Sequence, residues 1–420
     1  MTRGWRWRHA AARGAVCCAL ALPGAALAQQ WTVQSGARTQ AEFNSNPGMN
    51  PTPGTSLTTR SLAANFAAAR STETSESRFE ADLSHAPGGG GPGSRGGLAL
   101  RQRVNTPRQS WTGSASVQRD APQATPRAAS DLLIGAASRT TSDVSLGWTY
   151  TLDERWSAQL SGSRSATRLG AGAAAGGDFG AWSASTGLNF AWSETSSLGL
   201  SLDRSVQRPV LGDGGSTVDT LRLTGSQNVS ETGSLSLNLG RSLATRRFAV
   251  ASLVCPLPIA LCQAGLAPFV VALAAQEQRS HDLQFGASIN QRWNEVASLN
   301  LNLSRAHKPG VLGLMREDTL GLAFSTRWSD YSSGSLTYDG SRSRTVATGV
   351  ATTATLRTLG LSMSHRLTER LSLNAQLQQR RFSLASPQTG VTAKLFSISL
   401  QYQGDTVPGW PGWPGWPRLP

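Results

Sequence analysis

Residues 145–163, SLGWTYTLDERWSAQLSGS, alternate large apolar and small polar side chains on both sides of a short polar interruption. Leu146 and Trp148 hold the apolar positions before the interruption, and Trp156 and Leu160 hold them after it. A period of two residues is typical of a β-strand whose two faces lie in different media. This stretch therefore predicts a β-hairpin with one apolar face and one polar face.

The same hairpin recurs along the chain at a spacing of about 40 residues, which is a strong internal repeat. The connections between the hairpins are longer and rich in Gly, Ala and Pro. Transmembrane β-barrels alternate in this way, with tight periplasmic turns and longer extracellular loops. The further hairpins are expected at 182–205, 219–242, 283–305, 320–340 and 359–380.

Six further strands bring the total to about 18, within a range of 16–18. The predicted fold is all-β: a transmembrane antiparallel up-and-down barrel over residues 29–403, with short periplasmic turns and long extracellular loops. An even number of strands puts both ends of the chain in the periplasm. The additional strands are expected at 31–44, 57–70, 77–85, 98–104, 110–120 and 390–403.

The composition fits a barrel in which only one face of each strand is apolar. Hydrophobic residues make up 39% of the chain and charged residues 15%, whereas soluble domains carry nearer 25% charge and 45–50% apolar residues. The polar face should line a water-filled lumen of mostly neutral character, which suits water and saccharides better than ions. The lumen-lining candidates include Arg222, Asn238, Asp282, Asn302, Arg327, Asp339, Arg366, Gln376 and Arg380.

Four tryptophans occupy equivalent positions beside the short turns: Trp156, Trp192, Trp293 and Trp328. Aromatic side chains gather at the membrane–water interface of transmembrane barrels. We interpret the four as part of an aromatic girdle; the alternative is a set of unrelated core tryptophans.

The N-terminus has the features of a secretory signal peptide over residues 1–28. A basic start precedes a short apolar run and the small-x-small sequence Ala26-Leu27-Ala28. Together with the barrel pattern, this leader predicts a location in the bacterial outer membrane.

Two later segments differ from the repeat. Residues 247–275 are apolar and contain Cys255 and Cys262, which in an oxidising compartment most simply form one disulfide; two free thiols are the alternative. We expect a long loop there, which folds inward as a plug or stays outside. Residues 404–420 repeat Gly-Trp-Pro three times. This proline content excludes strand and helix and favours an extended tail, either a ligand for a periplasmic partner or a dispensable extension.

The sequence offers little for catalysis. The only adjacent His–Asp candidate is His281 with Asp282, no histidine has a metal-ligand spacing, and no phosphate-binding glycine loop is present. We therefore predict a non-enzyme with no metal and no cofactor.

The net charge of +14 comes from dispersed arginines in a secreted chain, which argues against nucleic acid as a partner. Several of these arginines fall at strand ends beside the long loops, where they would meet lipid and lipopolysaccharide phosphates or acidic polysaccharide; ordinary solvated rim charges are the alternative. They are Arg164, Arg204, Arg241, Arg305, Arg342 and Arg344.

The opening WTVQSGARTQAEFNSNP, with an aromatic-x-x-Asn element from Phe43 to Asn46, resembles the first strand of the porin-2 type of β-barrel outer-membrane proteins. The hairpin repeats extend the resemblance over nearly the whole mature chain, and the final strand KLFSISLQYQ resembles the signal that the barrel assembly machinery reads. Members of this type are associated with exopolysaccharide and PEP-CTERM systems, so the resemblance implies an outer-membrane barrel that serves polysaccharide export or surface anchoring. Our prediction is a porin-like channel associated with exopolysaccharide export. The alternative is a non-conducting scaffold or assembly protein that binds partners through its surface loops.

Overall fold

The structure is a computed structural model of the 420-residue chain. It describes residues 31–47, 49, 56–86, 94–120, 138–170, 178–209, 214–254, 270–310, 313–345, 353–385, 388–404 and 407–408.

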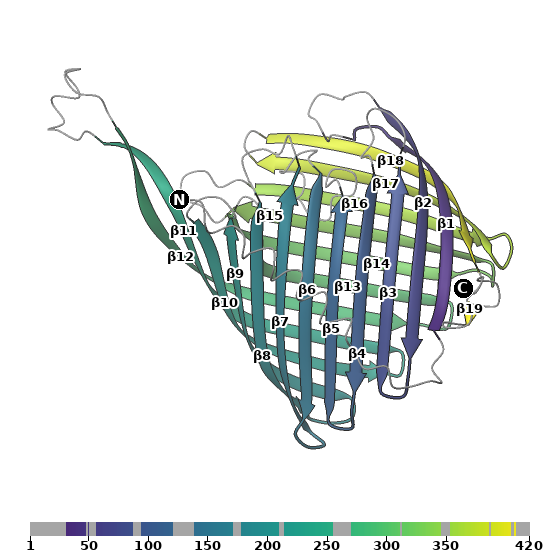
Figure 1. Ribbon diagram of the computed structural model, residues 1–420, viewed down its shortest axis with the longest axis horizontal. Helices are drawn as coiled ribbons and strands as arrows, with labels where there is room; N and C mark the ends of the chain where they lie inside the picture. The colour runs from purple at the N-terminus through teal and green to yellow at the C-terminus, as the bar shows by residue number, and fades with distance from the viewer. Residues whose placement is uncertain are drawn as a thin grey trace, which may run out of the picture.

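Eighteen long strands follow one another around a closed antiparallel barrel (Figure 1). The first nine are β1 (Trp31–Asn44), β2 (Leu57–Ser71), β3 (Ser75–His85), β4 (Arg95–Asn105), β5 (Gln109–Asp120), β6 (Arg139–Thr151), β7 (Trp156–Leu169), β8 (Phe179–Ala191) and β9 (Ser196–Pro209).

The second nine continue in the same order. They are β10 (Gly214–Ser230), β11 (Gly233–Val254), β12 (Val270–Arg292), β13 (Ala297–Gly310), β14 (Gly313–Arg327), β15 (Ser332–Thr345), β16 (Thr353–Arg366), β17 (Leu371–Ala385) and β18 (Gln388–Gln403).

The barrel closes between its first and last long strands. β1 pairs with β18 from Gly36↔Gln403 to Asn44↔Leu395, so the sheet closes on itself. Closure matters because a strand edge inside a bilayer would leave backbone N–H and C=O groups without partners. The predicted 18-strand up-and-down barrel is confirmed.

The short turns share a side-chain cap that explains their sequences. In the turn after β6, the Asp153 Oδ1 atom accepts hydrogen bonds from the backbone N–H groups of Arg155 and Trp156, at 2.8 and 2.7 Å. Asn294 does the same for Val296 and Ala297 in the turn after β12. Short Asp and Asn side chains reach their own backbone two and three residues on, which fixes a tight turn.

The prediction of one long loop over 247–275 is wrong. β11 continues to Val254 and β12 begins at Val270, and the two pair without a break to the Val254↔Val270 pair. In Figure 1 this hairpin leaves the barrel and extends beyond its rim, which is not the path of an inward plug. Cys255 and Cys262 lie outside the described residues, so the disulfide stays a prediction.

Part of the C-terminal tail pairs with the first strand of the barrel. The tail was expected to exclude strand structure, yet Val407–Pro408 form a two-residue strand, β19, paired with Thr32 and Val33 of β1. The remainder of the tail and the signal peptide fall outside the described residues. Within the described part of the chain, no helix has the length and apolar character needed to cross a membrane.

Candidate functional site

The two faces of the barrel wall differ sharply in chemistry. Large aliphatic side chains project from one face and are exposed, as in Leu146 (67%), Leu160 (52%) and Leu361 (53%). The register places these positions side by side on neighbouring strands, and the positions between them carry Ser, Thr, Asn, Gln and Gly. Exposed aliphatic residues on the outside of a closed barrel require a lipid surround. We call the opposite face the lumenal face.

The four predicted tryptophans lie together with other rings at the short-turn end of the lipid face. All are exposed, Trp156 at 42% and Trp192 at 69%. The Trp156 and Phe190 ring centroids are 4.8 Å apart, and those of Phe190 and Trp192 are 6.2 Å apart. Trp293 similarly contacts Phe324 at 6.1 Å. Rings with one apolar edge and one polar atom favour the boundary between lipid and water.

The outside of this closed barrel carries a belt of aliphatic side chains and a group of aromatic rings at its short-turn end. Together these features identify the membrane in which the barrel lies. The protein is a β-barrel of the bacterial outer membrane. Its short turns face the periplasm and its long connections face outward, as this class of barrel is oriented.

The predicted lumen-lining residues fall into two groups. One group lies on the lumenal face, where the Arg222 Nη2 atom is 3.5 Å from the Asp203 Oδ2 atom. That group consists of Arg222, Asn238, Asn302, Arg327, Asp339 and Gln376.

Three of the predicted residues are not simply open to the lumen. Arg380 is only 6% exposed and donates through Nε to the Gln378 side chain at 2.8 Å. Arg366 lies at the periplasmic rim, with its guanidinium 5.2 Å from the Tyr331 ring centroid. Asp282 is engaged by side chains of β13 and β14, described below. The two-residue period gave the face of the strand but could not show which neighbours would cover it.

Cross-strand pairs of serines line the lumenal face. In six directly opposed Ser–Ser pairs the two Oγ atoms are 2.7 Å apart. From β5–β6 to β15–β16, each pair of strands that is connected at its extracellular end carries one of these serine pairs. Each hydroxyl can still offer a lone pair or a second contact to water or solute. The pairs are Ser114–Ser145, Ser163–Ser183, Ser197–Ser226, Ser236–Ser288, Ser298–Ser325 and Ser335–Ser362, and we call them the hydroxyl belt.

Glycines on the lumenal face leave space for neighbouring side chains to lie flat against the wall. A Cβ atom on Gly199 would collide with the side-chain oxygens of Asn189 and Thr224. The same holds for Gly147, whose added Cβ would lie 2.6 Å from the Thr112 Oγ1 atom. Since these polar groups lie along the wall, the glycines keep the lumen wide.

The outer half of one lumenal wall is apolar and covered, a feature that was not predicted. Met49, from the segment after β1, is 6% exposed and packs against lumenal side chains of β16, β17 and β18. Met49 has a positive φ of 49°, a conformation that non-glycine residues rarely adopt. Its neighbours in this lumenal cluster are Ala354, Leu356, Phe382, Val391 and Ala393.

Hydrogen bonds hold the chain just before Met49 against the wall. Ser45 donates its N–H to the Lys394 carbonyl at 2.9 Å, and its Oγ atom accepts the Lys394 N–H at 2.8 Å. The wall across the lumen is different, because Gln118, Gln159, Ser161 and other polar side chains there are exposed. The lumen is therefore open and polar along β3–β8 and partly filled near its mouth along β16–β18.

The adjacent pair His281 and Asp282 does not form a catalytic site. His281 is registered with Leu243 on the lipid face, and Asp282 is registered with Ser242 on the other face. The two side chains therefore start out on opposite sides of β12.

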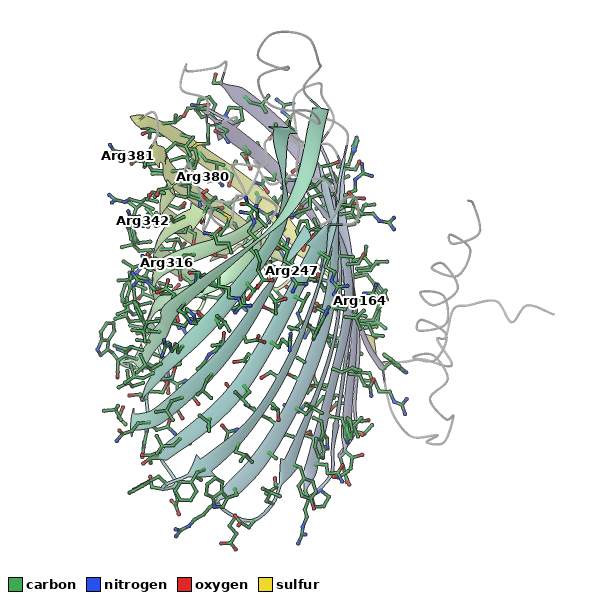
Figure 2. The ribbon with its side chains drawn as sticks, turned by 90° about the vertical axis from the view of Figure 1, so that its left-hand side faces the viewer. Arg164, Arg247, Arg316, Arg342, Arg380 and Arg381 are labelled. Carbon is green, nitrogen blue, oxygen red and sulfur yellow. The ribbon has the colours of Figure 1, made fainter. Side chains whose placement is uncertain are left out.

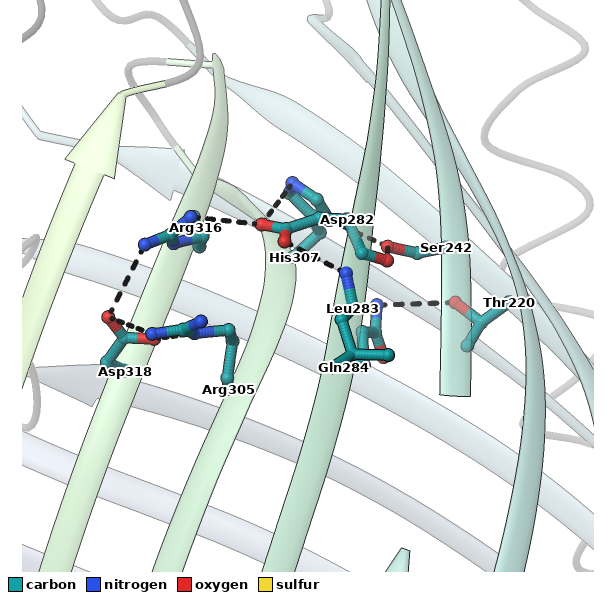
Figure 3. Close-up of polar contacts among 9 residues, drawn as sticks. All are labelled: Thr220, Ser242, Asp282, Leu283, Gln284, Arg305, His307, Arg316 and Asp318. Carbon is teal, nitrogen blue, oxygen red and sulfur yellow. Dashed lines mark hydrogen bonds and ion pairs between the residues drawn. The ribbon is translucent and has the colours of Figure 1, made fainter. Parts of the chain in front are cut away.

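A different polar cluster forms where β12 separates from β13 (Figure 3). The β12–β13 ladder ends at Phe285↔Arg305, and beyond it the Asp282 carboxylate contacts Arg316 Nη1 at 3.3 Å and His307 Nε2 at 3.9 Å. Ser242 Oγ lies 2.9 Å from His307 Nδ1.

This Ser–His–Asp group bridges strands and is not arranged for nucleophilic attack. Ser242 has no exposed surface, and its hydroxyl donates to the Asp282 carbonyl oxygen at 3.2 Å. A serine nucleophile must instead give its proton to the histidine and face the substrate. We interpret the cluster as the substitute for missing backbone pairing. In the described part of the chain, no group of three or more His, Cys, Asp and Glu side chains is placed to hold a metal ion.

Comparison with known proteins adds a likeness of fold. No protein-family model matches the chain, and no curated protein matches it. Among solved structures it is similar to OpdK of Pseudomonas aeruginosa, an outer-membrane protein (TM-score 0.46, 11% identity, 89% of this chain and 98% of that chain). It is also similar to OccAB3 of Acinetobacter baumannii, with a TM-score of 0.45 and 8% identity over 89% of this chain and 99% of that chain. A third similar structure is the ferric-catecholate import receptor Fiu of E. coli K12, with a TM-score of 0.43 and 9% identity over 88% of this chain and 81% of that chain. Likenesses at this level carry no argument about substrate.

Proposed function

We propose that the protein is a passive channel for neutral hydrophilic solutes, with saccharides as the solute class its wall fits best. The observation that carries the proposal is the hydroxyl belt, which repeats around the lumen within an 18-strand barrel. Barrels of this strand number are wide enough for an aqueous channel.

The charges on the lumenal face support a neutral solute. Arg78 Nε is 2.7 Å from the Glu80 Oε1 atom, and Arg222 is paired with Asp203 at 3.5 Å. Charges of both signs beside one another give little net field, whereas ion-selective pores use rings of one sign. Hydroxyl and amide groups can exchange hydrogen bonds with a sugar at small net cost, because they replace bonds of similar strength to water.

An association with exopolysaccharide export is a finer form of this proposal. It would require long, hydrated chains to slide past groups that bind each unit weakly. The exposed polar wall along β3–β8 offers such groups, and the apolar cluster around Met49 narrows the mouth from the other side.

The test is single-channel recording of the refolded mature chain in a planar bilayer. We expect stable openings, with partial and reversible blockade when neutral oligosaccharides are added. Ser163→Glu should make the pore cation-selective, because Ser163 lies on the lumenal face. The neighbouring Arg164→Gln should leave selectivity unchanged, because Arg164 lies on the lipid face (Figure 2).

Two results would contradict the channel. One is electrical silence from a preparation whose heat-modifiable migration shows a folded barrel. The other is an equal effect of the lumenal and lipid-facing substitutions.

A second candidate function, a non-conducting surface scaffold, is favoured by one observation. The β11–β12 hairpin runs past the barrel rim and offers an extended two-stranded surface (Figure 1). An exposed edge of this kind can add a strand from a partner. Removing the hairpin from a silent barrel and testing assembly of surface polymer would separate this function from conduction.

A further inference from the structure

Arginines face one another directly across strands on the lipid face of β14–β17. The register pairs Arg316 with Arg344 and Arg357 with Arg381. Arg342 lies between these pairs, since it faces Thr355, two residues from Arg357. Like charges directly opposite on a sheet are destabilising. Arg316 already contacts Asp282 and Asp318. The opposed Arg357 and Arg381, with Arg342 and Arg344 beside them, therefore call for an anion.

Several other arginines of the outer half of the lipid face are balanced by acids. Arg204 is 3.5 Å from Asp219, Arg305 is 2.6 Å from Asp318, and Arg247 and Arg279 both contact Glu277. By contrast, no described residue forms an ion pair with any of four exposed arginines, which we call the arginine patch. They are Arg342, Arg344, Arg357 and Arg381.

The arginine patch lies just above the aliphatic belt, at the extracellular end of the strands. A groove of about 440 Å³ runs beside it on the same wall. Leu303, Leu320 and Tyr338 line its lower part, and Arg342 and Arg357 line its upper part. Figure 2 shows Arg381, Arg342 and Arg316 one above another along one side of the barrel. Asp318 also lines the groove, but its carboxylate is paired with Arg305 at 2.6 Å. A ligand here therefore meets hydrocarbon below and the positive charge of the patch above.

We propose that the arginine patch binds the phosphates of a bisphosphorylated glycolipid in the outer leaflet, with an acyl chain in the adjacent groove. The patch spans the width from β15 to β17, two strand spacings or about 10 Å. The oxygens of a single phosphate accept hydrogen bonds only from donors about 3 Å away. Two phosphates held apart by a sugar backbone therefore fit this width better than one. Arginine suits the role because its planar fork binds phosphate through two parallel hydrogen bonds.

The experiment compares two variants that remove the same charge. The patch variant is R342Q/R344Q/R357Q/R381Q. The control is R60Q/R119Q/R164Q/R168Q, which changes exposed arginines of the lipid face that have no arginine opposite them. Diphosphoryl lipid A is titrated into each refolded barrel in detergent micelles, and bound lipid is counted by native mass spectrometry.

We expect the patch variant to lose affinity for lipid A by about tenfold or more, and the control to stay close to the wild type. Dephosphorylated lipid A should bind the wild type as weakly as intact lipid A binds the patch variant. In lipid-free micelles the patch variant should unfold at an equal or higher temperature, since repulsion between opposed arginines is removed.

Four results would overturn the proposal. If the patch variant binds lipid A as strongly as the wild type, the arginine patch is not the binding site. If both variants lose the same affinity for lipid A, the attraction is nonspecific. Competition by phosphatidylglycerol or by inorganic phosphate at equal concentration would assign the patch to a single phosphate. A lower unfolding temperature for the lipid-free patch variant would make the arginines structural.

Discussion

Met49 is predicted to keep the segment after β1 docked on the inner wall of the barrel. Burying a methionine side chain contributes about 1.5–3 kcal/mol, and Met49 is 6% exposed among lumenal apolar neighbours. Met49→Ala should therefore weaken docking by about 2 kcal/mol, which is roughly a 30-fold rise in the undocked population.

The positive φ of Met49 supplies an internal check on this magnitude. Alanine at φ 49° keeps the backbone strain, whereas glycine removes about 1 kcal/mol of it. Met49→Gly should therefore weaken docking by only about 1 kcal/mol, or roughly fivefold. The expected order is that alanine disrupts docking more than glycine, the reverse of what loss of side-chain volume alone would give.

Docking can be followed by thiol labelling inside the barrel. Ala393 is 2% exposed and belongs to the cluster that Met49 covers, so A393C reports on undocking in a background with Cys255 and Cys262 changed to Ser. Its labelling rate should rise about 30-fold with Met49→Ala and about fivefold with Met49→Gly. A cysteine at the exposed lumenal Ser161 should label at one rate in all backgrounds. Equal A393C rates with and without Met49 would refute the reasoning.

Three further predictions test other parts of the molecule. Gly199→Val should lower single-channel conductance, because the valine side chain displaces the Asn189 and Thr224 side chains from the wall into the lumen. Unchanged conductance would show that the glycine does not keep the lumen wide. Ser242→Ala should lower the free energy of unfolding in urea by about 1–3 kcal/mol, because it leaves buried groups unpaired, while Ser163→Ala at an exposed pair costs less than about 1 kcal/mol; equal losses would contradict this. Replacing 248–275 by Asn-Gly should leave conductance unchanged, because the hairpin extends away from the mouth of the barrel. A marked rise in conductance would instead show that these residues block the pore.

The period of two residues was enough to place the strands. β1 was expected at 31–44 and lies at Trp31–Asn44, and the final strand, expected at 390–403, is Gln388–Gln403. Alternation is informative here because lipid and water lie on opposite faces of a single-layer wall. It fails where both faces of a strand carry apolar residues, as in the sequence that continues β11 past Phe248.

The contacts inside the barrel were beyond the sequence pattern. The two apolar faces of β18, with Val391 and Leu395 beside Phe396, were a visible sign that something covers the lumenal side. Nothing in the local pattern identified Met49 as that cover. Likewise, the contact of Asp282 with Arg316 depends on where the β12–β13 ladder ends, which is a property of the closed sheet.

The length of the β11–β12 hairpin sets how far the protein stands out from the cell. At about 3.3 Å per residue, the 23 residues of β12 extend about 76 Å, whereas the 14 residues of β15 extend about 46 Å. The difference of about 30 Å is the length by which the ribbon can run past the barrel rim (Figure 1). We therefore expect antibodies, phages and proteases that arrive from outside to meet this ribbon before they meet the barrel. A peptide tag placed at its end is expected to be displayed on intact cells.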